Sequence, residues 1–213
     1  MRLTTSTIAL ILAAMPAAAQ RDYGRPVDSP ETRAMRALRG SAACAVDTAP
    51  ASARKVLESD VASLEEAKRV KSLIAVARKC YPQTWPDFPP SLVRGALAER
   101  LYLSSNQSRG PGATPAAPPA SFGVVALGTR GTADQETAWT LAAVANCVVF
   151  ADARAAHELL LVPAAVDEET RRFDTLRPAL DKCLAADQAK VLKAATFRGY
   201  LADALYRRTR GTS

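Results

Sequence analysis

Residue types that build metal and cofactor sites are scarce in this chain of 213 residues. It contains a single histidine, and its four cysteines form neither a Cys-x-x-Cys pair nor a Cys/His cluster. A structural zinc site normally needs such a cluster, and covalent haem attachment needs Cys-x-x-Cys-His. We therefore expect the protein to use no metal and no cofactor.

Motifs for nucleotides and nucleic acids are missing as well. The stretch Gly110-Pro111-Gly112 lacks the Lys-Ser/Thr of a phosphate-binding loop, and no recognised nucleic-acid module is present. The formal net charge of +7 comes from bases interleaved with acids, which is typical of a solvated surface. Such a charge favours anionic neighbours in general. Because no nucleic-acid module is present, we expect no nucleic-acid partner.

Long apolar runs are absent after the amino terminus. Residues 1–19 combine Arg2, the apolar run Ile8–Met15 and three alanines before Gln20, which is typical of a secretory signal peptide. The run is shorter than the roughly 20 apolar residues that span a bilayer. We expect a chain without a transmembrane segment that a bacterium exports to the periplasm or the medium.

Export makes disulfides the expected state of four cysteines. The same number of residues separates Cys44 from Cys80 as separates Cys147 from Cys183. Four cysteines allow three pairings, and if each pair belongs to one copy of a repeated unit, each copy most economically carries its own bridge. Each bridge would then stabilise the fold by about 3 to 4 kcal/mol on the loop-closure model.

Further residues support a tandem repeat. The shift that places Cys44 on Cys147 also places Glu65-Glu66 on Glu168-Glu169. One more residue of shift superimposes 94–102 on 198–206, and both segments read Arg-Gly-x-Leu-Ala-Asp/Glu-x-Leu-Tyr. A repeat of this length usually buries its apolar face against its neighbour.

Caps and apolar periodicity predict an all-α fold with about four helices in each half. Ser29 and Pro30 begin the first helix, which we expect to end near Val46, and Ser63 caps a third helix that ends at Cys80. If short connections make neighbouring helices antiparallel, the first and third helices point the same way. Cys44 and Cys80 would then lie side by side.

The predicted boundaries follow from these patterns. We also expect a capping box at Thr132 and Gln135, a third helix of the second half that Pro178 kinks or splits, and a short strand or extended arm over 121–130. The segments are a signal peptide (1–19), a lead-in (20–29), repeat 1 (30–103), a Pro/Ala/Gly-rich linker with the arm (104–131), repeat 2 (132–208) and a basic, frayed tail (209–213).

Arg94-Gly95 and Arg198-Gly199 are the most informative pairs, because a glycine inside a helix costs about 1 kcal/mol relative to alanine. One interpretation is a close contact between helices at the missing side chains, with each arginine covering apolar surface or meeting an acid. The other makes Arg94 and Arg198 an anion-binding site across a pseudo-twofold axis.

Other polar residues have simpler interpretations. We expect His157 to be an ordinary, partly exposed histidine and not a catalytic base. The pairs Glu65-Glu66 and Glu168-Glu169 are expected to stabilise helix amino termini, although a glycan-cleaving enzyme also needs paired carboxylates. Tyr102 and Tyr206 are expected to pack and not to bind.

Three motifs carry a resemblance to a known group. Cys147-Val148-Val149, Leu180-Asp181-Lys182-Cys183 and the repeated Arg-Gly-x-Leu-Ala-Asp/Glu-x-Leu-Tyr segment resemble uncharacterised secreted proteins of alphaproteobacteria, of the sphingomonad kind. The resemblance implies secretion and helicity and supplies no activity.

These expectations favour a non-catalytic protein that binds or scaffolds in the periplasm, with a groove between the halves as its site. Its partner would be a periplasmic protein or an anionic component of the envelope. The alternatives are a hydrolase acting on an envelope polymer and a weak binder of anionic envelope surfaces.

Overall fold

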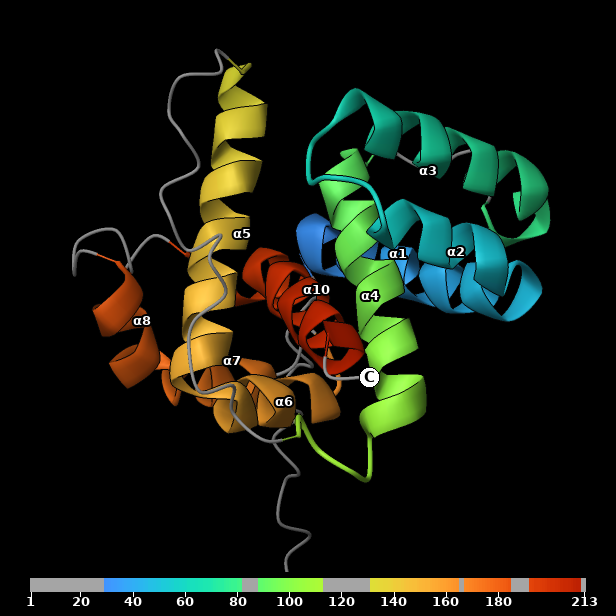
Figure 1. The fold of residues 1–213 in the computed structure, drawn as a ribbon. Coiled ribbons are helices and arrows are strands. Elements are labelled where there is room, and N and C mark those ends of the chain that lie inside the picture. Colours follow the sequence, from blue (N-terminus) through green and yellow to red (C-terminus); the bar gives the residue numbers. More distant parts are fainter. Residues whose placement is uncertain (1–28, 82–87, 113–130, 165–166, 185–191, 212–213) are drawn as a thin grey trace, which may run out of the picture.

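A computed structural model describes residues 29–81, 88–112, 131–164, 167–184 and 192–211. Over these ranges the chain is helical and contains no strand, which confirms the all-α class (Figure 1). The elements are α1 (Pro30–Thr48), α2 (Pro50–Leu57), α3 (Leu64–Val76), the 3-10 helix η1 (Arg78–Cys80), α4 (Pro90–Asn106), α5 (Ala133–Ala151), α6 (Ala153–Leu161), α7 (Asp167–Asp174), α8 (Arg177–Cys183) and α10 (Ala194–Gly211).

Side-chain caps fix where several helices begin. The Ser29 hydroxyl accepts a hydrogen bond from the Thr32 amide at the start of α1. At α5, Thr132 and Gln135 form the predicted reciprocal capping box. These caps satisfy amide groups that the first turn of a helix would otherwise leave without a partner.

Both predicted disulfides are formed. Cys44 near the end of α1 bonds to Cys80 of η1, with their Cα atoms 5.6 Å apart. Cys147 of α5 bonds to Cys183 at the end of α8, with 5.8 Å between the Cα atoms. Each bridge therefore ties together two helical segments of one half, which confirms the predicted pairing.

The third helix of the second half is split just before Pro178 into α7 and α8, which is one of the two outcomes predicted for this proline. The described part of this half therefore has five helices, where about four were predicted. Other predicted helix limits are wrong. The first-half counterpart, α3, ends at Val76, and η1 continues to Cys80. Helix α4 extends to Asn106, which was assigned to the linker.

The carboxyl terminus also differs from the prediction. Helix α10 continues to Gly211, so the predicted frayed tail is helical as far as the structure describes it. Its arginines have partners: Arg207 pairs with Asp203 one turn earlier at 3.1 Å, and Arg208 donates to the Val149 carbonyl. The predicted signal peptide, the 121–130 arm and residues 188–191 of the predicted last helix lie outside the described residues.

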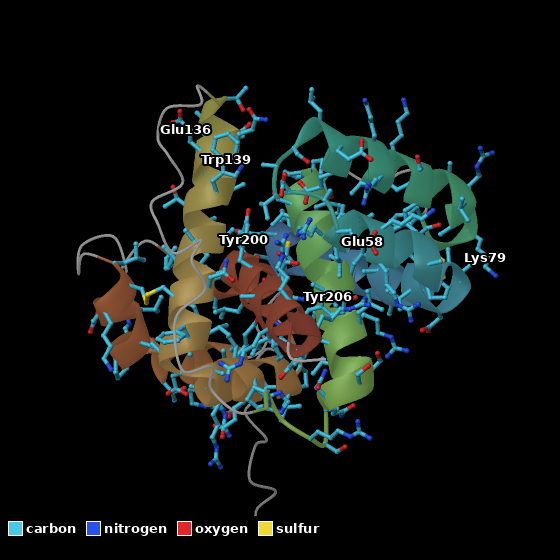
Figure 2. All side chains as sticks on the ribbon, viewed as in Figure 1. Glu58, Lys79, Glu136, Trp139, Tyr200 and Tyr206 are labelled. Carbon is cyan, nitrogen blue, oxygen red and sulfur yellow. A yellow bond between two sulfur atoms is a disulfide. The ribbon has the colours of Figure 1, made fainter. Side chains whose placement is uncertain are left out.

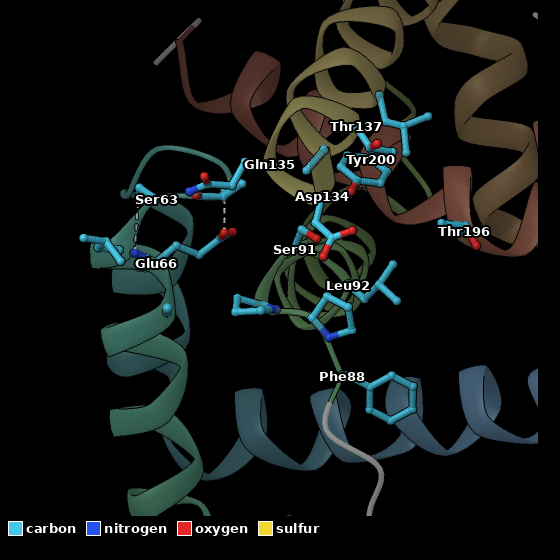
Figure 3. A pocket seen from close by; sticks show the side chains of 17 residues that line it. Ser63, Glu66, Phe88, Ser91, Leu92, Asp134, Gln135, Thr137, Thr196 and Tyr200 are labelled. Atoms are coloured by element: carbon cyan, nitrogen blue, oxygen red, sulfur yellow. Dashed lines mark hydrogen bonds between the residues drawn. The ribbon is translucent and has the colours of Figure 1, made fainter. Parts of the chain in front are cut away.

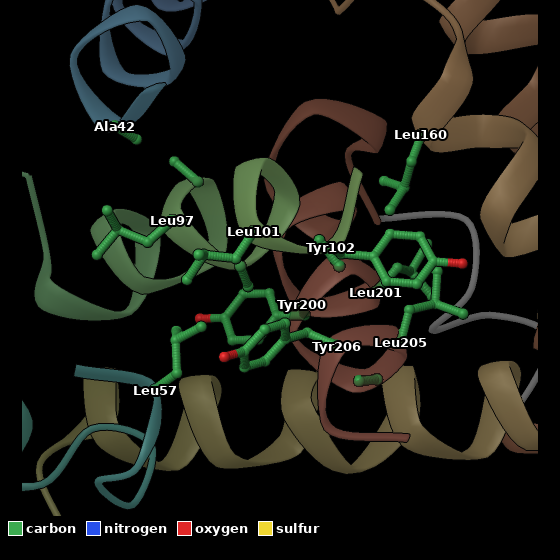
Figure 4. Close-up of a cluster of buried hydrophobic side chains, with 14 of the residues drawn as sticks. Ala42, Leu57, Leu97, Leu101, Tyr102, Leu160, Tyr200, Leu201, Leu205 and Tyr206 are labelled. Atoms are coloured by element: carbon green, nitrogen blue, oxygen red, sulfur yellow. The ribbon is translucent and has the colours of Figure 1, made fainter. Parts of the chain in front are cut away.

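Helices α4 and α10 form the centre of the molecule. Figure 4 shows apolar side chains of both helices meeting Leu57 of α2 and Leu160 of α6. The two helices approach most closely at their glycines, where a Cβ atom built on Gly95 would lie 2.7 Å from the Gly199 Cα. This contact requires glycine, because any side chain at Gly95 would overlap the backbone of the other helix.

Candidate functional site

Arg94 is almost completely buried, with 1% of its surface exposed. Its Nε–H donates to Asp203 of α10 at 3.0 Å, and Nη1 lies 3.4 Å from the carboxylate of Glu66 at the start of α3. The remaining donors reach backbone carbonyls at the end of α2 and just beyond it, those of Val56, Leu57 and Ser59. The guanidinium is therefore surrounded by acceptors that the protein itself supplies.

Arg198 repeats this arrangement from the second half. It is 2% exposed, and its Nε and Nη2 atoms donate to Glu99 of α4 at 3.1 and 2.8 Å. Nη1 lies 3.4 Å from Glu169 of α7. The carbonyl acceptors are those of Leu159, Leu160 and Val162, at the end of α6 and just beyond it.

Each acid on the central helices also meets a second arginine. Glu99 accepts from Arg39 of α1 at 3.2 Å, and Asp203 accepts from Arg207 at 3.1 Å. Burial lowers the pKa of Arg39, and the neighbouring Glu99 opposes this effect. The ion pairs form two clusters, each of two arginines and two acids, and we call the two together the central ion network. One cluster contains Arg94, Arg207, Glu66 and Asp203, and the other contains Arg39, Arg198, Glu99 and Glu169.

The anions at Arg94 and Arg198 are thus carboxylates of the chain. Their donors are occupied by carboxylates and carbonyls, and both side chains are closed off from solvent. The contacts follow the first interpretation of the Arg-Gly pairs, in which the glycines permit a close helix contact and each arginine meets an acid. An ion pair this deeply buried contributes little net stability, but breaking it leaves a buried charge without a partner.

The partners Glu99 and Asp203 were not predicted from the sequence. A signal for them was present, because both stand five residues after the arginine in the repeated segment. What the sequence did not reveal is that the arginine of each half reaches the acid of the other half. Glu66 and Glu169 lie at helix starts as predicted, yet they are buried partners of these arginines.

His157 was predicted to be partly exposed, and this prediction is wrong. It is buried on α6, and its Nδ1 lies 2.9 Å from the hydroxyl of Tyr102, which is fully buried. Burial lowers the pKa of His157 and raises the pKa of Tyr102 to about 12. Burial removes both groups from contact with a substrate, so the pair is best explained as a packed hydrogen bond.

A cavity of about 650 Å³ lies between the two halves, and we call it the interhalf cavity. Its first-half wall comes from the starts of α3 and α4, and its second-half wall from α5 and α10 (Figure 3). The lining consists of Ala62, Ser63, Leu64, Glu66, Ala67, Phe88, Pro89, Pro90, Ser91, Leu92, Asp134, Gln135, Thr137, Ala138, Leu141, Thr196 and Tyr200. Apolar side chains and a few polar groups therefore line it together.

The polar groups of the interhalf cavity are held in place by local contacts. Gln135 donates from its side chain to the Ala62 carbonyl and so joins α5 to the turn before α3. Burial raises the pKa of Tyr200, and a hydrogen bond to Ser91 partly opposes the shift. Among the described residues that line this cavity there is no lysine or arginine, whereas two carboxylates, Glu66 and Asp134, are present.

Glu66 is a buried carboxyl group of this lining. Burial raises its pKa, while Arg94 and the Ala62 amide oppose the shift. Its Oε1 faces Arg94 at 3.4 Å and its Oε2 accepts from the Ala62 amide at 2.7 Å. Because both oxygens are engaged, Glu66 is not positioned to transfer a proton to a ligand.

Metal and membrane features are absent from the part of the chain that the structure describes. It contains no group of three or more His, Cys, Asp or Glu side chains that could hold a metal ion. It also contains no helix that is long and apolar enough to cross a membrane. None of the protein-family models, curated proteins or solved structures compared with the chain matches it.

Proposed function

We propose that the protein is an exported, non-catalytic binding protein that holds an amphipathic ligand in the interhalf cavity. The observation that carries the proposal is the cavity itself, whose volume of about 650 Å³ falls within the range of small-molecule sites. Apolar side chains with a few oriented polar groups are the usual lining of such sites.

The charge of the lining narrows the ligand class. Glu66 is fully buried and pairs with Arg94, so Asp134 is the charged side chain that this lining presents to a ligand. The cavity therefore favours an apolar molecule that is neutral or carries an amine. Asp134 is exposed at the start of α5, where it can accept a hydrogen bond from a ligand. A carboxylate-bearing ligand would meet repulsion there without a compensating base.

Two observations support export and a duplicated origin. Disulfides persist in oxidising compartments, and the chain forms two of them behind the signal-like residues 1–19. The contacts of Arg94 recur at Arg198 under the two offsets that relate the repeated segments. We infer a protein built from a tandem duplication that is periplasmic or secreted, and the resemblance to secreted alphaproteobacterial proteins also implies secretion.

Binding is tested with the neutral fluorescent probe N-phenyl-1-naphthylamine. Thr137 lines the cavity and Thr140 does not, although both are exposed on α5 and both hydroxyls donate to the carbonyl four residues earlier. Thr137→Phe should fill the cavity and weaken probe binding by about tenfold or more, since the probe loses its apolar contacts. Thr140→Phe is the matched control and should leave binding within about twofold.

Two results would overturn the proposal. The first is a probe that does not bind the wild-type chain, and the second is equal loss in both threonine variants. The hydrolase alternative would use Glu66, whose pKa is raised by burial, but only if its two oxygens left their present partners, Arg94 and the Ala62 amide. If the wild-type chain released soluble fragments from purified peptidoglycan and the Glu66→Gln variant did not, hydrolysis would replace binding as the proposed function.

A further inference from the structure

A second cavity, of about 460 Å³, lies at the opposite end of α4 and α10. The interhalf cavity touches the first turns of these two helices, whereas this one touches their last turns. Three arginines line it from three different segments: Arg54 of α2, Arg109 just after α4, and Arg210 of α10. We call it the arginine pocket.

The lining of the arginine pocket carries positive charge, and Glu58, an acid outside the lining, interacts electrostatically with Arg210. No aspartate or glutamate is among the described residues that line it. Arg54 and Arg109 are exposed, and neither makes a side-chain hydrogen bond or ion pair with any residue that the structure describes. This contrasts with Arg94 and Arg198, whose donors are all used within the protein.

The third arginine is held in position. Arg210 donates to the hydroxyl of Tyr206 at 2.9 Å, and its guanidinium lies 5.8 Å from the centre of that ring. Tyr206 itself is buried between α4 and α10, where it forms part of the core (Figures 2 and 4). The pocket thus has one guanidinium held by Tyr206 and two that have no partner among the residues described by the structure.

Hydroxyl and apolar groups complete the pocket. Leu101 contributes apolar surface, and Ser105 contributes a hydroxyl that makes no hydrogen bond with the described residues. Guanidinium groups and hydroxyls together recognise phosphate oxygens, because each guanidinium presents a planar pair of donors. A volume of about 460 Å³ leaves room for more than one phosphate group.

We propose that the arginine pocket binds a phosphate-bearing ligand through Arg54, Arg109 and Arg210. The phosphate belongs either to a free ion or small phosphate ester, or to the headgroup of an anionic phospholipid. This proposal does not rest on the ligand of the interhalf cavity, which has the opposite charge preference and lies at the other end of the central helices.

The test measures binding of inorganic phosphate by calorimetry and of phosphatidic acid vesicles by sedimentation, at low ionic strength with the disulfides intact. The double variant Arg54→Gln/Arg109→Gln should lose about tenfold or more in affinity, because charged hydrogen bonds are lost. Lys71→Gln/Arg78→Gln removes the same charge from exposed positions outside the pocket and should change affinity by less than about twofold.

Inorganic phosphate and phosphatidic acid vesicles distinguish a free phosphate ligand from a lipid headgroup. Binding of inorganic phosphate that the pocket variant weakens supports a free phosphate ligand. Binding to phosphatidic acid vesicles alone, again weakened by the pocket variant and absent with phosphatidylcholine, supports a lipid headgroup. Equal loss in both double variants would show attraction to the overall charge, and this result or the absence of binding to either ligand would overturn the proposal.

Discussion

Replacing Gly95 by alanine should destabilise the protein, although alanine is the better helix former. A Cβ atom at this position would lie 2.7 Å from the Cα and 2.9 Å from the carbonyl carbon of Gly199. Both neighbours are backbone atoms, which cannot rotate away as a side chain can. The helices α4 and α10 would have to move apart, and the central ion network between them would be stretched.

The magnitude follows from two opposing effects. Overpacking a close contact typically costs about 1 to 3 kcal/mol, and the upper end applies because the obstacle is backbone. The higher helix propensity of alanine offsets about 1 kcal/mol of this loss in the free energy of unfolding. We expect Gly95→Ala to lower the free energy of unfolding by about 2 kcal/mol, which for a chain of this size lowers Tm by about 4 to 8 °C.

Two further glycines provide a graded series. A Cβ atom on Gly199 would lie 3.1 Å from the Gly95 Cα, so a smaller shift suffices and the propensity gain should offset most of its cost. Gly40 on α1 has nothing within 4 Å, and Gly40→Ala should stabilise the protein by about 0.4 to 1 kcal/mol. Urea unfolding of the oxidised chain, followed by circular dichroism, gives all three values.

The expected order of stability is Gly40→Ala above wild type, Gly199→Ala near wild type and Gly95→Ala lowest. A Gly95→Ala variant as stable as Gly40→Ala would show that the two central helices are not in backbone contact. An equal loss for all three variants would show that the propensity argument fails in this fold.

Three other perturbations test the central ion network, a disulfide and the buried histidine. Arg94→Met should cost about 3 to 5 kcal/mol in urea unfolding, because it leaves the buried Glu66 without its arginine and Asp203 with Arg207 alone. Arg100→Met on the same helix breaks an exposed pair and should cost less than about 1 kcal/mol, and equal losses would contradict the burial argument. Replacing Cys147 and Cys183 together by alanine should cost about 3 to 4 kcal/mol, and an unchanged unfolding midpoint would argue against a stabilising bridge. Because burial lowers the pKa of His157 in the folded chain, the unfolded chain binds its proton first, and stability should fall as pH drops below about 6.5, by at most about 1.4 kcal/mol per pH unit. His157→Gln should remove this part of the pH dependence, and identical pH profiles for both proteins would refute the assignment.

Local patterns were sufficient to predict the helices and the disulfides. The caps at Ser29 and Thr132 depend on residues three positions away, so they are visible in the sequence. The bridge from Cys44 to Cys80 followed from helix direction and from the equal spacing of the two cysteine pairs, which compares the two halves of the sequence and requires no structure. Whether Pro178 would kink the helix or split it was left open. The sequence alone does not distinguish a proline that kinks a helix from one that ends it.

The cavities depend on residues that are distant in the chain. The interhalf cavity joins Glu66 and Ser91 to Gln135 and Tyr200, and none of these residues belongs to a motif for binding. Arg54 and Arg109 were similarly indistinguishable from other surface arginines until the fold brought them near Arg210. The burial of His157 could not be predicted for the same reason, because its hydrogen-bond partner Tyr102 lies far from it in the sequence.

Because each buried arginine pairs with an acid from the other half, the two halves depend on each other for stability. Arg94 takes Asp203 from the second half, and Arg198 takes Glu99 from the first. A half produced alone would bury its arginine without the acid that the other half supplies. It would also expose the helix surface around Gly95 or Gly199, which the other central helix normally covers. We therefore expect that neither half folds independently. In the intact chain the two halves should unfold together in a single cooperative transition.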